Sequence, residues 1–211
     1  MPTTPTATAA GTASAPAPAG PDDVVLPPPR QEGGKPLLQA LRERKSEREF
    51  SPEPLPLQQL SDLLWAAAGI SRPESGKRTI PSAKNWQMVE VVAILPDGAY
   101  LYDAKANLLR NLAKDDLRPL AGKQGFVASA PLTLVYVSDP LKLPIEVPEE
   151  DRTLYAAVET GCITQNVYLF CASEGLATVV RASVDRPVLA MALHLPLTHR
   201  ITLVQTVGKR P

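Results

Sequence analysis

The chain has 211 residues, and its 22 Lys and Arg balance 22 Asp and Glu to a formal net charge of zero at pH 7. This balance provides no overall field that would attract nucleic acid or an anionic membrane, so neither is expected as a partner and any anion site must be local. No apolar run approaches the roughly 18 residues of a helix that spans a membrane. The length predicts one domain with a sizeable core.

The N-terminal segment differs in composition from the rest. After Met1, residues 2–20 are rich in Pro, Ala and Thr, have no apolar side chain larger than Ala, and cannot bury enough surface to fold. Residues 1–34 are therefore predicted to be a disordered leader, and 35–211 the folded domain. The leader has neither the basic start nor the apolar stretch of a signal peptide. This indicates a cytoplasmic protein as written, or a periplasmic one if an upstream signal peptide has been removed.

From residue 35 onward, helical and strand patterns alternate. Helices are expected from 36, at 56–69, at 107–113, at 149–174 and from 185; strands are expected at 89–95, 100–102, 131–137, 176–180 and 201–207. This order predicts an α+β layered domain, with a central mixed β-sheet flanked by helices.

One long helix, from Glu149 to Glu174, is the central predicted element. Acidic residues crowd its first turn, where the helix dipole favours them, and Gly175 is a natural C-cap. Apolar or small side chains recur on more than one of its sides, at Leu154, Ala157, Val158, Gly161, Cys162, Tyr168, Leu169 and Ala172. Such a helix is buried on nearly all sides. It either runs through the core of one chain or lies half in the core and half in a subunit interface.

Several common catalytic and binding motifs do not fit this sequence. The segment 75–79 (S-G-K-R-T) lacks the upstream Gly and the Ser or Thr after Lys that a phosphate-binding loop needs. His194 and His199, the only histidines, lack metal-ligand spacing, so no metal site is predicted. Cys162 and Cys171 are expected to be small core residues. If the protein is an enzyme, a cofactor is expected to carry the reaction, and no catalytic side chain is proposed.

A basic cluster indicates what that cofactor could be. Arg44, Lys45, Ser46 and Arg48 supply two guanidinium groups, an ammonium and a hydroxyl within five residues. In an extended chain Arg44, Ser46 and Arg48 would lie on one side, a geometry that suits a phosphate monoester. The alternative is a solvated basic face at the C-terminus of a helix.

A second cluster is the segment 81–87, P-S-A-K-N-W-Q. Ser82, Asn85 and Gln87 offer uncharged donors and acceptors, as a flat heterocycle and a polyol chain would require. A capped turn that leads into the next strand is the alternative interpretation.

Four segments, in order along the chain, resemble the nitroreductase family of flavoproteins. They are R-K-S-E-R-E-F (44–50) with the Leu-rich helix that follows it at 57–70, P-S-A-K-N-W-Q (81–87), Q-N-V-Y-L-F-C-A-S-E-G-L-A-T (165–178) and V-G-K-R-P (207–211). The resemblance covers 36–211 and is closest to the compact branch related to azoline-forming dehydrogenases. It implies a nitroreductase-like layered domain that binds FMN at the interface of a homodimer. Many members carry a long C-terminal extension that clasps the partner, and this chain stops at Pro211.

The resemblance also implies which residues contact FMN. The implied phosphate contacts are Arg44, Ser46 and Arg48 with Lys45 beside them, helped by Lys209 or Arg210. The implied ribityl and ring-edge contacts are Ser82, Asn85 and Gln87, with Pro81 and Ala83 in the same turn. Backbone N–H groups of Glu174 and Gly175, next to Leu176, would point at the flavin N5 and O4. Arg181 is also placed at the pocket.

The function that this resemblance implies is an FMN-dependent oxidoreductase. NADH or NADPH would reduce the flavin, leave, and be replaced by a small organic acceptor of the nitroaromatic or quinone type, a ping-pong exchange. One alternative is a flavin-dependent dehydrogenase that oxidises a bound substrate and passes the electrons to oxygen. Another is a non-catalytic binding protein that has lost the flavin.

Overall fold

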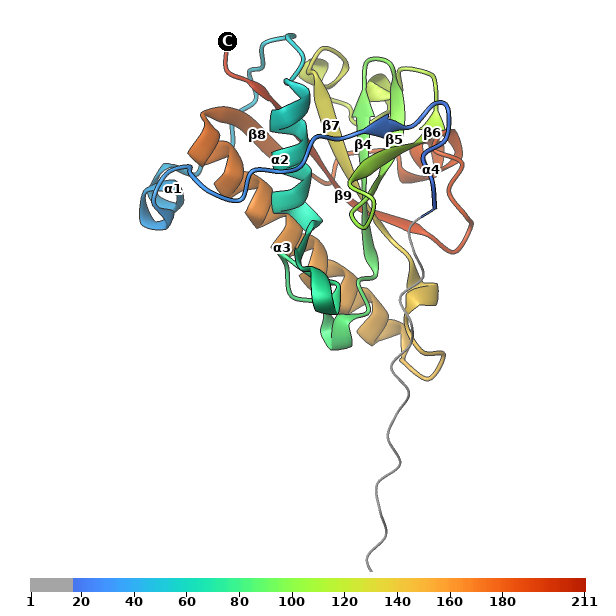
Figure 1. Ribbon diagram of the computed structural model, residues 1–211. Coiled ribbons are helices and arrows are strands. Elements are labelled where there is room, and N and C mark those ends of the chain that lie inside the picture. The colour runs from blue at the N-terminus through green and yellow to red at the C-terminus, as the bar shows by residue number, and fades with distance from the viewer. Residues whose placement is uncertain (1–16) are drawn as a thin grey trace, which may run out of the picture.

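The computed structural model describes residues 17–211 (Figure 1). Within these residues, seven strands form one sheet in the order β1-β6-β5-β4-β7-β9-β8. The strands are β1 (Val24–Val25), β4 (Val89–Leu95), β5 (Gly98–Asp103), β6 (Leu108–Ala113), β7 (Leu132–Ser138), β8 (Leu176–Arg181) and β9 (Arg200–Lys209). A separate hairpin is formed by β2 (Ile70–Arg72) and β3 (Lys77–Arg78).

The prediction of a mixed sheet is wrong, because every neighbouring pair in the seven-stranded sheet is antiparallel. The strands β4, β5 and β6 follow one another through short turns, and such connections join antiparallel neighbours. The alternation of helices and strands along the chain therefore does not produce parallel strands here.

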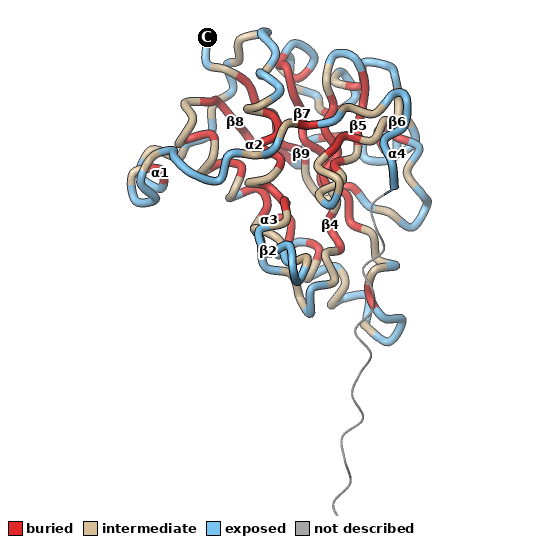
Figure 2. The backbone as a smooth tube through the Cα atoms, viewed as in Figure 1, coloured by how far each residue is buried: buried red, intermediate tan, exposed pale blue. Residues whose placement is uncertain are grey.

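Helices cover both faces of the sheet and confirm the α+β layered domain. The helices are α1 (Leu37–Glu43), α2 (Leu57–Ala68), α3 (Glu149–Glu174) and α4 (Arg186–Ala192). Helices α2 and α3 share one apolar core with the sheet, and α4 contributes to a second core on the other face. Figure 2 shows the buried chain concentrated in the sheet and on the sides of α2 and α3 that meet it.

The long helix α3 has the predicted bounds, and Gly175 ends it in the left-handed conformation (φ 74°). One face of α3, which includes Ile163, Val167 and Cys171, is buried against the sheet and α2. The opposite face is open: Leu154 is 55% exposed and Val158 is 56% exposed. The chain therefore leaves apolar side chains uncovered on this face of α3.

The helix predicted at 107–113 is a strand. Strand β6 pairs with β5 on one side and with β1 on the other. Asn107 adopts a left-handed φ of 48° at the end of the turn from β5, which reverses the chain into a hairpin. Leu108 and Leu109 are buried, so tertiary pairing overrides a weak local preference for helix.

Residues 17–34 are part of the folded domain, so the predicted leader boundary at 34 is wrong for them; residues 1–16 lie outside the described part. Strand β1 pairs with β6 through Val24 and Val25, and Leu26 is only 4% exposed. Arg30 then forms an ion pair with the buried carboxylate of Asp62, with Nε and Oδ2 2.7 Å apart. Hydrogen bonds to the Pro27 and Pro28 carbonyl oxygens and to the Asp23 carboxylate add to these contacts and fix the segment.

Among residues 17–211, no helix combines the length and the hydropathy that crossing a membrane requires.

Removal of residues 17–34 should destabilise the domain. A chain that starts at residue 35 loses the burial of Leu26 and leaves Asp62 without its cation, so its free energy of unfolding should fall by about 2 kcal/mol or more. Urea unfolding of chains that start at residues 17 and 35 measures the difference. Equal midpoints for the two chains would contradict this account of the segment.

Candidate functional site

The basic segment 44–51 runs in an extended conformation across the ends of two strands. The Glu47 N–H donates to the carbonyl oxygen of Thr178 on β8, and the Ser51 N–H donates to that of Lys209 on β9, both at 2.9 Å. These two bonds fix the segment to the sheet edge. The predicted alternation of side chains follows from this extended backbone.

The side chains of Arg44 and Ser46 meet the same residue of α3, Tyr168. The guanidinium carbon of Arg44 lies 5.2 Å from the centre of the Tyr168 ring, and the Ser46 Oγ lies 2.7 Å from the Tyr168 hydroxyl oxygen. That hydroxyl also accepts from the Val180 N–H at 3.0 Å. Either hydroxyl can donate in the Ser46–Tyr168 bond, and when Tyr168 donates, the Ser46 proton is free to bind a ligand.

The guanidinium groups of Arg44 and Arg48 have no carboxylate partner among residues 17–211. The other three predicted cations pair within the chain: Lys45 and Arg210 with Glu47 at 3.1 and 3.0 Å, and Lys209 with Glu53 at 2.7 Å. Arg44 and Arg48 thus flank Ser46 in the sequence as two guanidinium groups without a carboxylate partner in the part of the chain that the structure describes, on a chain of zero net charge.

The turn at 81–87 is strained. Lys84, Asn85 and Gln87 have positive φ angles of 46°, 59° and 52°. Each left-handed residue other than Gly costs roughly 1–2 kcal/mol. Strain of this kind persists only where surrounding contacts fix it, and it is concentrated at functional sites.

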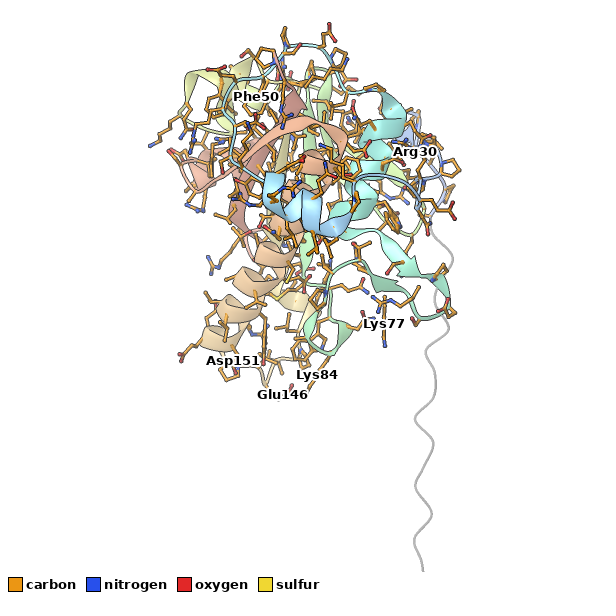
Figure 3. All side chains as sticks on the ribbon, turned by 90° about the vertical axis from the view of Figure 1, so that its left-hand side faces the viewer. Arg30, Phe50, Lys77, Lys84, Glu146 and Asp151 are labelled. Carbon is orange, nitrogen blue, oxygen red and sulfur yellow. The ribbon has the colours of Figure 1, made fainter. Side chains whose placement is uncertain are left out.

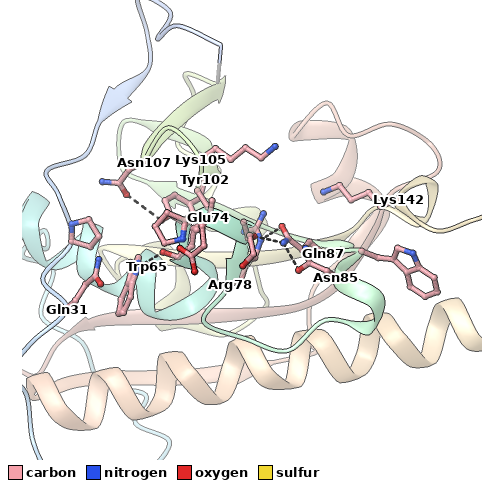
Figure 4. Close-up of a pocket in the computed structure, with 17 residues that line it drawn as sticks. Gln31, Trp65, Glu74, Arg78, Asn85, Gln87, Tyr102, Lys105, Asn107 and Lys142 are labelled. Carbon is pink, nitrogen blue, oxygen red and sulfur yellow. Dashed lines mark hydrogen bonds between the residues drawn. The ribbon is translucent and has the colours of Figure 1, made fainter. Parts of the chain in front are cut away.

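Hydrogen bonds from Gln87 hold this turn, as Figure 4 shows in part. The Gln87 Nε2 donates to the Gly76 carbonyl at 2.8 Å and to the Asn85 Oδ1 at 2.9 Å, and its Oε1 accepts from the Arg78 Nε at 2.7 Å. The Gln87 N–H donates to the Ser82 Oγ at 2.7 Å. Gln87 therefore fixes the turn, and its expected contact with the cofactor stays a prediction.

The Ser82 hydroxyl and the Asn85 Nδ2 have no acceptor among residues 17–211. These two groups can therefore donate to a ligand, and Pro81 and Ala83 supply only backbone around them.

One chain does not bring the two clusters together. Trp86, in the turn, packs edge-on against Tyr155 with ring centres 5.7 Å apart, whereas Arg44 and Ser46 contact Tyr168. Thirteen residues separate Tyr155 from Tyr168, which is about 20 Å along a helix. Figure 3 shows the same separation: Lys84 lies at the Asp151 end of α3 and Phe50 at the other end of the molecule.

At the end of α3 the structure differs from the expected flavin contacts. The Gly175 N–H donates to the Cys171 carbonyl and closes the helix, so it does not point into open space. A Cβ at Gly175 would meet no atom within 4 Å, and its positive φ is the reason for glycine there. The carboxylate of Glu174 lies 3.6 Å from Arg30, and Leu176 is buried.

Arg181 makes its side-chain hydrogen bonds with residues that are not among the other predicted site residues. Its guanidinium donates to the Ala121 carbonyl at 3.1 Å and to the Thr206 Oγ1 at 2.7 Å, and it stacks on Phe126 with 5.6 Å to the ring centre. Burial lowers its pKa to about 10. These contacts give Arg181 a role between the sheet and the 114–130 segment, and none of them is with the basic segment.

Comparison with known proteins decides the family. The family model described as Nitroreductase family matches residues 41–209, which include both clusters and all of α3. The chain belongs to the nitroreductase family. Membership of this family makes the protein, in general terms, a flavin-dependent oxidoreductase.

Individual relatives agree with this nitroreductase assignment. A protein of Methanocaldococcus jannaschii with a provisional nitroreductase name is 33% identical over 153 residues, which are 68% of this chain and 76% of the relative. A crystal structure from Ralstonia eutropha JMP134, also provisionally named a nitroreductase, is 40% identical with a TM-score of 0.85 and covers 95% of this chain and 96% of its own.

A more distant relative shares the nitroreductase fold alone. It is the NADPH:FMN oxidoreductase from Vibrio harveyi complexed with NAD+, 21% identical with a TM-score of 0.62 over 82% of this chain and 68% of its own.

Sequence reasoning did not identify Tyr168 as a site residue, because its position on α3 made it one of many apolar side chains. Tyr168→Phe should lower the free energy of unfolding by about 1–3 kcal/mol, since the Val180 N–H loses its acceptor. Tyr155→Phe is the matched control, because the Tyr155 hydroxyl has no hydrogen-bond partner among residues 17–211. Urea unfolding of the two variants tests this, and an equal loss in both would contradict the role of Tyr168.

Proposed function

We propose that this protein is an FMN-dependent oxidoreductase that takes electrons from NADH or NADPH and passes them to a small organic acceptor of the nitroaromatic or quinone type. The observation that carries the proposal is the basic cluster of Arg44, Ser46 and Arg48, in a member of the nitroreductase family. FMN would supply two-electron chemistry between the nicotinamide and the acceptor. The name of the Vibrio harveyi relative, an NADPH:FMN oxidoreductase, supports this choice of cofactor and donor.

The basic segment fits the phosphate end of FMN. Arg44 and Arg48 can donate charge-assisted hydrogen bonds, and Ser46 can donate a third from the hydroxyl that Tyr168 orients. Lys45 and Arg210 share the single carboxylate of Glu47 and would add net positive charge nearby, and Lys209 would have to leave Glu53 to do so. The ring end of FMN needs other donors, because the Gly175 N–H is used within α3.

We infer that a second copy of the chain supplies those donors. Gly161 lies six residues after Tyr155 and seven before Tyr168, near the centre of α3 and on its exposed face. Two α3 helices that cross antiparallel at Gly161 would bring Tyr155 of each protomer level with Tyr168 of its partner. The Ser82 and Asn85 donors of one protomer would then lie beside the Arg44 cluster of the other.

The open face of α3 supports this homodimer. Leu154 and Val158 are more than half exposed in one chain, and Ala157, Gly161 and Gln165 continue the exposed stripe. No atom lies within 4 Å of a Cβ built on Gly161, so a partner backbone can approach closely there. A stripe of this kind on a soluble domain marks an interaction surface.

The phosphate contacts can be tested by comparing two flavins. Changing both Arg44 and Arg48 to Ala should lower FMN affinity at least about tenfold, because each charge-assisted hydrogen bond contributes roughly 1.5–3 kcal/mol. Riboflavin, which lacks the phosphate, should bind as before. Arg42→Ala is the control, since Arg42 belongs to α1 and Glu43 is its one carboxylate neighbour among residues 17–211. Equal losses for FMN and riboflavin in the double variant would place the two arginines elsewhere.

The interface can be tested with a charge on the open face. Val158→Glu should raise the dimer dissociation constant at least about a hundredfold, because two uncompensated carboxylates would be buried at once. Met191→Glu on α4 is the control, because Met191 is 73% exposed and lies away from α3. Light scattering gives the mass and circular dichroism the fold. An unmodified protein that loads FMN as a monomer would contradict the interface.

The order of binding can be tested by steady-state kinetics. If electron donor and acceptor use one pocket in turn, double-reciprocal plots of initial rate against NAD(P)H concentration, at several acceptor concentrations, should be parallel lines. Converging lines would indicate a ternary complex instead.

A further inference from the structure

A cavity of about 930 Å³ lies beside the strained turn, and its volume is that of a small-molecule site (Figure 4). Its walls come from the β2–β3 hairpin, the turn between β5 and β6, and the N-terminal segment at Pro29 and Gln31. Asn85 and Gln87 form the wall that it shares with the turn. A ligand in this cavity would therefore lie next to the ring-end donors assigned above.

Aromatic side chains line this cavity. Trp65, Trp86 and Tyr102 contribute to its walls, and the two tryptophans are the only ones in the chain. The Trp65 ring is fixed by a hydrogen bond from its Nε1 to the Ile70 carbonyl at 3.1 Å. Burial raises the pKa of Tyr102 to about 12, so its ring stays neutral at physiological pH. These walls suit a flat, aromatic ligand.

The charge of the lining is positive. Arg78, Lys105 and Lys142 face a single carboxylate, that of Glu74. Lys142 is paired with Glu90 at 2.6 Å, whereas neither Arg78 nor Lys105 has a carboxylate partner among residues 17–211. The cavity lining thus carries more positive than negative charge, with Glu74 as its one acidic residue and no ion pair at Arg78 or Lys105 among residues 17–211.

Arg78 is the fixed cation of the pair. Its Nε donates to Gln87 and its Nη1 to the Ala68 carbonyl at 2.6 Å, while its Nη2 has no partner among residues 17–211. Burial lowers the pKa of its guanidinium, which reflects the loss of water around the charge. A desolvated guanidinium with one open nitrogen binds an anion more strongly than an exposed one.

We propose that this cavity binds planar aromatic carboxylates, with the carboxylate on Arg78 and Lys105 and the ring between Trp65 and Tyr102. Acids of this class that carry a nitro group would be the electron acceptors of the enzyme, an assignment that rests on the proposed function. A nitro group on the acid would take a hydride equivalent from NAD(P)H and one proton from water. It would become a nitroso group, and one of its oxygens would leave as water.

The experiment compares 4-nitrobenzoate with 4-nitrobenzamide, which have the same ring and similar shape and differ in charge. Both tryptophans line the cavity, so their fluorescence, corrected for ligand absorbance, reports binding without turnover. The protein should bind the carboxylate at least about tenfold more tightly than the amide. Equal affinities for the two compounds would overturn the proposal.

Variants then test whether Arg78 and Lys105 cause the preference for the carboxylate over the amide. Arg78→Gln should abolish the preference for the carboxylate. Lys105→Gln should reduce the preference without affecting the fold, because the Lys105 ammonium has no hydrogen bond or ion pair among residues 17–211. Lys77→Gln is the matched control, because Lys77 is an exposed neighbour of Arg78 outside the lining. A preference that survives both Arg78→Gln and Lys105→Gln, or that Lys77→Gln reduces equally, would contradict the assignment.

FMN content, read from flavin absorbance, separates this proposal from the proposed function. If FMN binds and the two nitro compounds bind equally, the cavity assignment fails and the function stands. If the carboxylate is preferred and the protein rejects FMN, binding of aromatic acids stands and the acceptor role fails with the function.

Discussion

The rest of the structure depends on how α3 is covered. Its own chain buries one face against the sheet and α2, and leaves Leu154, Val158 and Gly161 on an open apolar face. The same helix carries Tyr155 at the turn and Tyr168 at the basic segment, about 20 Å apart. An antiparallel contact between the α3 helices of two copies, at Gly161, would bury this apolar face. The same contact would bring the two halves of the proposed cofactor site together, so dimer formation and function would depend on each other.

The sequence predicted correctly those features that interactions between residues close in the chain determine. The acidic first turn and the glycine after Glu174 gave the bounds of α3 because dipole and C-cap effects act within a few residues. The shared side of Arg44 and Ser46 followed from strand-like alternation, and both contact Tyr168. The four family segments gave the fold, since their order along the chain is specific even though each is short.

The features that sequence reasoning missed depend on distant partners. Residues 17–34 looked unfolded by composition, yet Arg30 pairs with Asp62 and Leu26 is buried, contacts that composition cannot reveal. The bonds from the Gln87 amide to Arg78 and Gly76, which hold the turn, could not be read from the sequence either. The strand at 108–113 likewise formed because two neighbours pair with it.

The most direct test of a shared site mixes two defective chains. One carries Arg44→Ala and Arg48→Ala, and the other carries Ser82→Ala and Asn85→Ala, so each homodimer lacks half of every site. After the two are refolded together, the mixed dimer has one site with both halves intact. FMN absorbance should then return to about one quarter of the unmodified level, by random pairing of the chains. Flavin content that stays at the level of the separate variants would contradict a site built from two chains.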